Sequence, residues 1–529
     1  MVSGKNGSEA TLAGENPSRM PSDEEGYAVA ETQAGKIRGH LNDGIFIFKG
    51  VAYGEDTSTR RFQAGERVRA WTDVRDALEF GDQCLQPPTP DFELLRSGWD
   101  TPGRMSENCL NLNIWTPALN DGGKRPVMVN MHGGGFTVGS GNSAGRSGEA
   151  FARTHDVVRV NVNHRLGLFG FSQTAEMLGP EYAGSGTLGL RDIILALEWV
   201  RDNIEAFGGD PDNVTIFGVS GGGGKVSALM AMPAAQGLFH RASMESGSML
   251  MAKPPELAVD ATRRLLGALE IPAERASDIL ALTGEQLLAA FLRLYPDGGL
   301  ISAGIAPIID GINLPDHPFH PAAPAMSDHI PMLVGTTITE SSIFPEILGG
   351  DPFGISWDDV SERLPKLLPP GLPLSAADIM AKSRQLLPDA SPTDILFKIM
   401  TESFFRRAAI RQAELASQRS ANVYMWRIDW PVPTDGGKWG APHGLSVPLV
   451  MDTVDAATAM LGEGLEQGRE LSASMTAAWA AFARSGSPQT PRLPQWPAYE
   501  TGKRETMIFD TVCHVDEDPD RKFREMFAM

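Results

Sequence analysis

The sequence predicts an α/β protein: one large domain on a central, mostly parallel sheet with helices on both faces. Strand-like and helix-like segments alternate along the 529 residues, and 42% hydrophobic content is enough for a large core. The length alone would allow three or four domains, but no linker and no internal repeat divides the chain. We therefore expect a single domain over residues 27–529, preceded by a polar, disordered tail at residues 1–26.

An apolar strand at residues 215–219 runs into a Gly-X-Ser-X-Gly turn and then a helix. In such a nucleophile elbow the serine has a strained backbone that exposes its hydroxyl, and the glycines let the strand and the helix pass closely. Ser220 is therefore a candidate nucleophile. Glycine-rich turns also bind phosphate, but Lys225 is not followed by Ser or Thr, and the acidic ribose partner is absent.

A second glycine turn follows the apolar strand expected at residues 125–131, where the chain reads His-Gly-Gly-Gly-Phe. Backbone N–H groups in such a turn can stabilise negative charge that develops on a substrate oxygen. We expect an oxyanion hole whose donors are the amides of Gly134, Gly135 and Gly221. An ordinary glycine turn is the alternative, and the presence of both motifs in this order favours the oxyanion hole.

A serine nucleophile needs a base, and histidine is the usual one. Of the ten histidines, His443 lies in a loop after the strand-like segment 422–429, where its side chain could reach the carboxyl edge of the sheet. His132 is the runner-up and is expected to brace the oxyanion loop instead.

A third group must orient the imidazole and stabilise its cation. Glu340 follows the apolar strand-like segment 330–335, although a glutamate at such a position is more often a solvated loop residue. The chain order Ser220, Glu340, His443 is that of the α/β-hydrolases.

From about residue 30 to residue 510 the chain resembles the type-B carboxylesterases. The resemblance implies an α/β-hydrolase fold with helical cap insertions near residues 251–330 and 345–420. Besides the motifs above, it rests on residues 48–53 (FKGVAY), 106–117 (SENCLNLNIWTP), 189–192 (GLRD), 199–204 (WVRDNI), 207–211 (FGGDP), 239–242 (FHRA), 245–247 (ESG) and 496–499 (WPAY).

The resemblance implies a serine hydrolase that cleaves carboxylic esters through an acyl-enzyme, with Ser220, Glu340 and His443 as its triad and with no cofactor. A carbamate or amide hydrolase would use the same triad. A non-catalytic, hydrolase-like binding protein is a more distant alternative, because the three catalytic residue types are intact.

Four positions depart from the family's usual residues. Val219 and Gly221 stand where the family has Glu and Ala around the nucleophile, and Gly221 still offers its amide on a looser backbone. Ser341 replaces the glycine after the acid, and Ser446 replaces an acidic residue three positions after the histidine.

The substrate is expected to be a small ester that is uncharged or apolar. Trp99 matches a cholinesterase tryptophan that binds quaternary ammonium by cation–π attraction. Against a cationic substrate, Val219 replaces the glutamate beside the nucleophile, and Ile343 stands where cholinesterases have an aromatic ring. We expect Trp99, Val219 and Phe344 to line the substrate site.

By the same resemblance, Cys84 and Cys109 match two cysteines that form a disulfide in secreted family members. Such a bridge would stabilise the fold by roughly 3 kcal/mol. Without a visible signal peptide, the oxidised and reduced forms both stay open. Cys513 is expected to pack as a thiol. No cysteine spacing fits zinc and HExxH is absent, so no metal site is expected.

The net charge of -20 argues against nucleic acid and anionic membranes as partners. No run of about 18 apolar residues is present, so no membrane span is expected. The first 25 residues lack the apolar segment of a signal peptide, which favours the cytoplasm. A periplasmic or secreted location would follow if a signal peptide had been removed. The sequence does not predict the oligomeric state.

Overall fold

The structure is a computed structural model that describes all residues except 1–25, 89–92, 100, 297–304, 420–421 and 529. The predicted disordered tail, residues 1–26, lies outside the described residues apart from Gly26.

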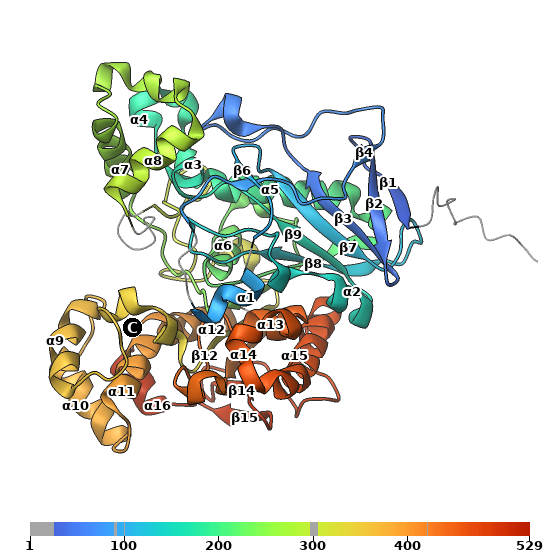
Figure 1. Cartoon of the computed structure of the whole chain (residues 1–529). Helices are drawn as coiled ribbons and strands as arrows, with labels where there is room; N and C mark the ends of the chain where they lie inside the picture. The colour runs from blue at the N-terminus through green and yellow to red at the C-terminus, as the bar shows by residue number, and fades with distance from the viewer. Residues whose placement is uncertain (1–25, 89–92, 100, 297–304, 420–421, 529) are drawn as a thin grey trace, which may run out of the picture.

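A thirteen-stranded sheet runs through the molecule (Figure 1). Its middle, from β9 to β14, is parallel, and its two ends are antiparallel apart from the short β4, which pairs with β2 in parallel. A separate pair is formed by β5 (Gln83–Cys84) and β6 (Met105–Ser106). In spatial order the strands of the large sheet are β1 (Tyr27–Glu31), β2 (Lys36–Asn42), β3 (Ile45–Ala52), β7 (Asn111–Thr116), β9 (Val158–Val162), β8 (Arg125–Met131), β10 (Gly209–Val219), β11 (Arg241–Glu245), β12 (Met332–Thr337), β13 (Val423–Ile428), β14 (Glu505–Phe509) and β15 (His514–Glu517), with β4 (Arg75–Asp76) beside β2.

Alternate residues of the central strands belong to two different hydrophobic cores. In β8, Val127 and Val129 belong to one core and Met128 to the other. In β10, Ile216 belongs to the first core and Phe217 to the second. Successive side chains of a strand point to opposite faces, so both faces of the sheet are buried, as a parallel sheet requires.

Helices cover both faces. The core of Val127 also contains residues of α5 (Leu188–Asn203), α6 (Gly221–Leu229) and α12 (Arg407–Ser417). The core of Met128 contains residues of α2 (Glu149–His155), α13 (Ser446–Met451) and α15 (Leu465–Ser485). The helical face predicted in α5 is confirmed, because Leu190, Ile193, Ile194, Leu197 and Val200 are all buried.

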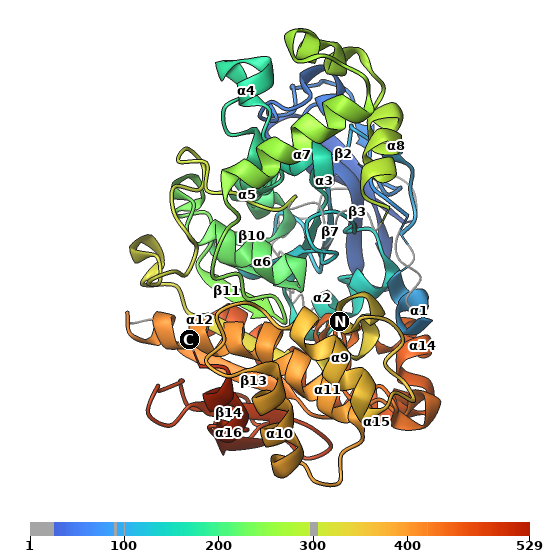
Figure 2. The same cartoon turned by 90° about the vertical axis from the view of Figure 1, so that its left-hand side faces the viewer.

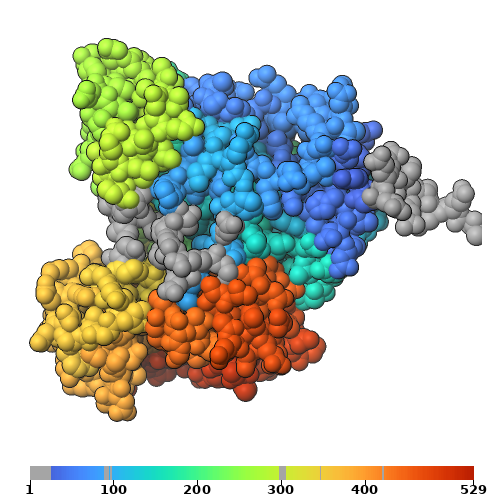
Figure 3. Space-filling view, viewed as in Figure 1, coloured from blue at the N-terminus to red at the C-terminus, as the bar shows by residue number. Residues whose placement is uncertain are grey.

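Two helical segments project on the same side of the molecule and lie apart from each other (Figures 1, 2 and 3). Both fall in the stretches expected to be cap insertions, and their role as a cap stays a prediction. The first contains α7 (Pro255–Ala268) and α8 (Gly284–Leu294), and the second contains α9 (Trp357–Leu367), α10 (Ala376–Leu386) and α11 (Pro392–Met400).

The remaining α-helices are short. They are α1 (Arg96–Trp99), α3 (Gly167–Phe171), α4 (Ala175–Leu178), α14 (Thr458–Leu461) and α16 (Arg521–Met526). Within the described part of the chain, no helix has the length and apolar character needed to cross a membrane.

Candidate active site

Ser220 lies in a strained turn between β10 and α6. Its φ of 58° and ψ of -126° fall in a region that L-residues rarely adopt. The flanking glycines are required: a Cβ on Gly218 would lie 2.5 Å from the carbonyl oxygen of Met131, and a Cβ on Gly222 would lie 2.1 Å from the same oxygen. The Ser220 amide donates to the carbonyl of Glu245 on the neighbouring strand (2.8 Å). This is the backbone geometry expected of a nucleophile elbow.

His443 and Glu340 form a buried pair. Nδ1 of His443 lies 2.6 Å from Oε2 of Glu340. The other carboxylate oxygen accepts the amide of Thr337 at the end of β12 (2.7 Å). The two loops are joined where the Thr339 amide donates to the carbonyl of Ala441 (3.2 Å). With Nδ1–H donated to the carboxylate, Nε2 of a neutral imidazole is left to accept a proton.

Parallel pairing places the three predicted residues at one edge of the sheet. Ser220 follows β10, Glu340 follows β12 and His443 lies in the loop after β13. These strands are connected in parallel through β11, so their carboxyl ends meet at the same edge. The three predicted catalytic residues therefore emerge on the same side of the molecule.

The oxyanion loop begins after β8 and lies beside the elbow. Gly134 and Gly135 have φ values of 89° and 62°, which favour glycine. A Cβ on Gly133 would lie 3.5 Å from Cβ of Ser220. Among the described residues, no acceptor is bonded to the amides of Gly134, Gly135 or Gly221. These three donors are thus available to a substrate oxygen, and their catalytic use stays a prediction.

His132 braces this loop and is a poor candidate for the base. Its Nδ1 donates to the carbonyl of Gly133 (2.8 Å), and its ring stacks on His164 at 4.8 Å. Burial, and then the charge of Lys225, lowers the pKa of both imidazoles well below the ordinary value. Both rings are therefore neutral at physiological pH.

The three predicted substrate-site residues differ in their surroundings. Val219 is 2% exposed and packs in the core, which leaves its side chain little surface for a ligand. Trp99 lies beside the histidine loop, because a Cβ on Gly444 would be 3.5 Å from a carbon of its ring. The guanidinium carbon of Arg146 lies 5.1 Å from the centroid of the Trp99 indole. A protein cation is therefore already on the ring that could have held a substrate cation.

Two aromatic rings contact the imidazole of His443. The centroid distances are 5.0 Å for Phe344 and 5.2 Å for Phe405. Phe405 comes from the π-helix η12 (Thr401–Arg406), a rare conformation that is frequent at functional sites. The position of Phe405 cannot be predicted from the sequence, because a single π-helical turn has no distinctive residue pattern.

Glu245 is a buried carboxyl directly beneath the elbow. Burial raises its pKa from 4.5 to about 7. The indole N–H of Trp479 donates to it (3.1 Å). Arg146 and Arg159, both fully buried, act in the opposite direction and favour the ionised carboxylate.

Cys84 and Cys109 are buried free thiols in contact with each other. A hydrogen bond to Cys84, and then burial, raises the pKa of Cys109. The disulfide between them stays a prediction. The described residues contain no cluster of three or more His, Cys, Asp or Glu that could hold a metal ion.

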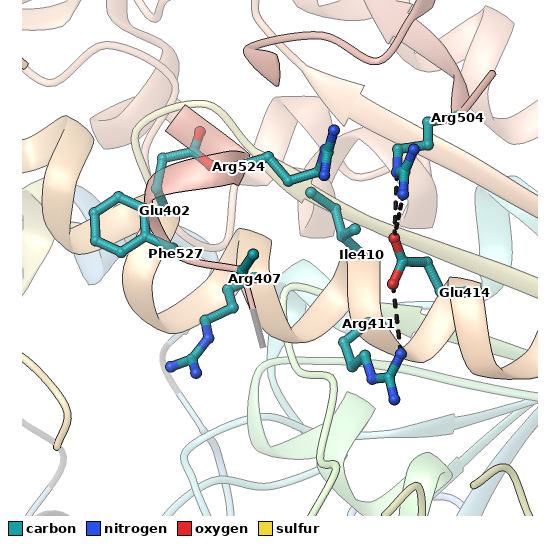
Figure 4. Close-up of a pocket in the computed structure, with 9 residues that line it drawn as sticks. Glu402, Arg407, Ile410, Arg411, Glu414, Arg504, Arg524 and Phe527 are labelled. Atoms are coloured by element: carbon teal, nitrogen blue, oxygen red, sulfur yellow. Dashed lines mark hydrogen bonds and ion pairs between the residues drawn. The ribbon is translucent and has the colours of Figure 1, made fainter. Parts of the chain in front are cut away.

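A separate hollow of about 200 Å³ lies between α12 and α16 (Figure 4). Its guanidinium groups are largely paired: Arg411 and Arg504 with Glu414, and Arg524 with Asp518. None of the three predicted catalytic residues lines it, and we assign it no role in catalysis.

Comparison with known proteins agrees with this geometry. The sequence profile of the carboxylesterase family matches residues 27–524. The chain belongs to the carboxylesterase family. It is 35% identical to para-nitrobenzyl esterase of Bacillus subtilis (strain 168), over 94% of this chain and 98% of that protein. It is 32% identical to phenmedipham hydrolase of Pseudarthrobacter oxydans, over 89% of this chain and 92% of that protein.

Solved structures give the same result. A carboxylesterase of Geobacillus stearothermophilus superposes with a TM-score of 0.82 at 34% identity, covering 94% of this chain and 99% of that one. This member of the carboxylesterase family therefore has the α/β-hydrolase fold and is a carboxylic ester hydrolase that acts on small esters.

Proposed function

We propose that Ser220, His443 and Glu340 are the catalytic triad of this ester hydrolase. The observation that carries the proposal is the 2.6 Å contact between His443 and Glu340 at the sheet edge where the elbow serine emerges. His443 Nε2 takes the proton of Ser220 as its Oγ attacks the ester carbonyl. Glu340 keeps Nδ1 protonated and stabilises the imidazolium that forms.

The attack places negative charge on the former carbonyl oxygen, and the amides of Gly134, Gly135 and Gly221 donate hydrogen bonds to it. Collapse of this intermediate breaks the ester bond, and His443 gives its proton to the departing alcohol. Water then attacks the acyl-enzyme by the same route, and the carboxylic acid leaves with Ser220 restored. Free amides at these glycines support this assignment.

We propose that the preferred esters are uncharged and carry an apolar group beside His443. Phe344 and Phe405 supply an aromatic surface at the imidazole. Arg146 on the Trp99 ring opposes a second cation at that place. Both features favour a neutral, apolar substrate.

A carbamate or an amide is the alternative substrate class. The same nucleophile, base and oxyanion donors would serve it. The relative named phenmedipham hydrolase keeps this class open. Slow turnover of the acyl-enzyme on simple esters, with amide cleavage at a comparable rate, would favour the alternative.

The experiment that tests the triad is nitrophenol release from a graded series of p-nitrophenyl acyl esters. Ser220→Ala is expected to lower kcat by about 10⁴-fold or more. Ser472→Ala is the control, because it removes another buried hydroxyl, which donates to the carbonyl of Leu449 in α13. It should leave kcat unchanged. Activity that survives in Ser220→Ala would exclude this serine as the nucleophile.

We propose the cytoplasm as the compartment. The proposal implies that the buried neighbours Cys84 and Cys109 remain thiols, because a reducing compartment keeps such pairs unbridged. Mass spectrometry of the unreduced protein from its native cells tests this: free thiols agree with it, and a bridge would favour the periplasm or secretion.

A further inference from the structure

Lys225 is a fully buried amine on α6, in the second turn after Ser220. Its Nζ donates to the carbonyl oxygen of His132 (2.8 Å) and lies 5.9 Å from the ring centroid of Phe136. Burial, and then the nearby charge of Arg146, lowers its pKa well below the ordinary value. A lysine is almost never fully buried without a carboxylate partner, and among the described residues no carboxylate forms an ion pair with Lys225. Its position therefore calls for a specific explanation.

Lys225 is one of the donors that satisfy the carbonyl groups of the oxyanion loop. Buried carbonyls need donors, and those of Gly133 and Gly134 find theirs within the loop: His132 Nδ1 donates to Gly133 (2.8 Å), and the Thr137 and Val138 amides donate to Gly134 (3.3 and 3.1 Å). The carbonyl of Phe136 accepts the amide of Gly167 from outside the loop (2.7 Å). Lys225 joins the first carbonyl of the loop, that of His132, to the helix that follows Ser220.

The proposed oxyanion hole has two parts on different elements. Gly134 and Gly135 belong to the loop after β8, and Gly221 is the first residue of α6. Donors stabilise the transition state only if they converge on one oxygen, within a few tenths of an ångström of the productive geometry. The Lys225–His132 hydrogen bond spans these two elements just before the first loop donor.

We propose that Lys225 is a positioning residue of the oxyanion hole. Its amine holds the His132 carbonyl in place, and so keeps the amides of Gly134 and Gly135 aligned with that of Gly221 on one substrate oxygen. The inference rests on the proposed oxyanion hole and adds to it a side chain that acts without touching substrate.

A role in packing alone makes the opposite prediction. A buried amine that lacks a carboxylate partner costs free energy of folding, and methionine, an apolar side chain of similar length, relieves that cost while it leaves the His132 carbonyl without its donor, so the two effects on stability oppose each other. If Lys225 only filled space, Lys225→Met would keep full activity. If it positions the loop, Lys225→Met loses activity without losing stability.

The test measures kcat, KM and Tm of Lys225→Met with p-nitrophenyl acetate. We expect kcat to fall about 10- to 100-fold, as for loss of an oxyanion-hole contact, with KM within about threefold and Tm nearly unchanged. The rate of inactivation by an alkyl phosphonate should fall in parallel, because its phosphoryl oxygen occupies the same hole. Lys225→Gln keeps an N–H donor on a shorter chain and should retain more of the wild-type kcat than Lys225→Met.

The control is Val226→Ala, the next residue on the same helix, which is also fully buried. It should lower Tm by a few degrees through lost packing and leave kcat within about twofold. Wild-type kcat in Lys225→Met, or a loss of kcat matched by a loss of Tm, would overturn the inference. Absence of turnover in the wild-type protein would overturn the proposed function instead, so the two failures are distinguishable.

Discussion

The carbonyl oxygen of Gly135 occupies the space that a side chain on Gly221 would need. A Cβ on Gly221 would lie 1.9 Å from that oxygen and 2.6 Å from the Cα of Gly135. The family usually has alanine at this position, and the observed position of the loop leaves no room for the alanine methyl group.

Gly221→Ala should therefore impair catalysis although it restores the family's usual residue. The new methyl must push away the backbone of Gly135, and the donors lose their alignment. We expect kcat to fall about tenfold or more, short of the 10²- to 10³-fold cost of deleting a donor. Steady-state kinetics on p-nitrophenyl acetate measures this. An alanine variant with wild-type kcat would show that the loop adjusts freely.

Phe405→Ala should alter acyl-chain preference. Removing the ring beside His443 opens apolar space, so the kcat/KM ratio of octanoyl to acetyl esters should rise about tenfold. Phe404→Ala is the matched control, because its side chain is on the same π-helix and 43% exposed. Equal changes in the two variants would mean that Phe405 does not contact the acyl group.

The protein should hydrolyse an uncharged ester with a higher kcat/KM than a cationic ester of the same shape. Because Arg146 lies over Trp99, we expect kcat/KM for 3,3-dimethylbutyl acetate to exceed that for acetylcholine at least about tenfold. The two alcohols have nearly the same shape, so the comparison isolates the charge. Preference for acetylcholine would show that a substrate cation is accommodated despite Arg146.

Glu245 should make stability depend on pH. Its pKa is about 7 in the folded protein and near 4.5 when unfolded, so between these values the folded state binds the extra proton. The free energy of unfolding should therefore fall as pH rises from about 4.5 to 7, by up to roughly 3 kcal/mol. Glu245→Gln should remove this slope in urea titrations at pH 5 and pH 8.

The control for that experiment is Glu285→Gln, an exposed carboxyl at the start of α8. Its pH dependence should match that of the wild-type protein. If Glu245→Gln keeps the same slope as Glu285→Gln, then Glu245 is not the group that titrates in this range.

The sequence was sufficient for the fold, and it led to three candidate residues that the structure places after parallel strands at one edge of the sheet. Short-range rules led to Ser220, because an elbow needs glycines at fixed offsets. Strand-end logic led to Glu340 and His443, and the structure places the latter two in contact. Local pattern and chain order are enough to find a candidate residue when its position depends only on the strand or turn that carries it.

Contacts between distant segments could not be predicted. Lys225 was considered only as part of a phosphate motif, since nothing in its helix indicates that it bonds the His132 carbonyl. Phe405 reaches His443 through a π-helical turn, and Arg146 reaches Trp99 from a separate loop. These positions depend on tertiary packing, which hydrophobic periodicity does not encode.

The most direct test of the account is mass spectrometry of the protein after inactivation by a fluorophosphonate. If Ser220 is the nucleophile, one adduct is expected, on the peptide that contains Ser220, formed in proportion to the loss of esterase activity and absent from Ser220→Ala. An adduct on another residue, or equal labelling of wild-type protein and Ser220→Ala, would contradict the assignment of Ser220 as the nucleophile.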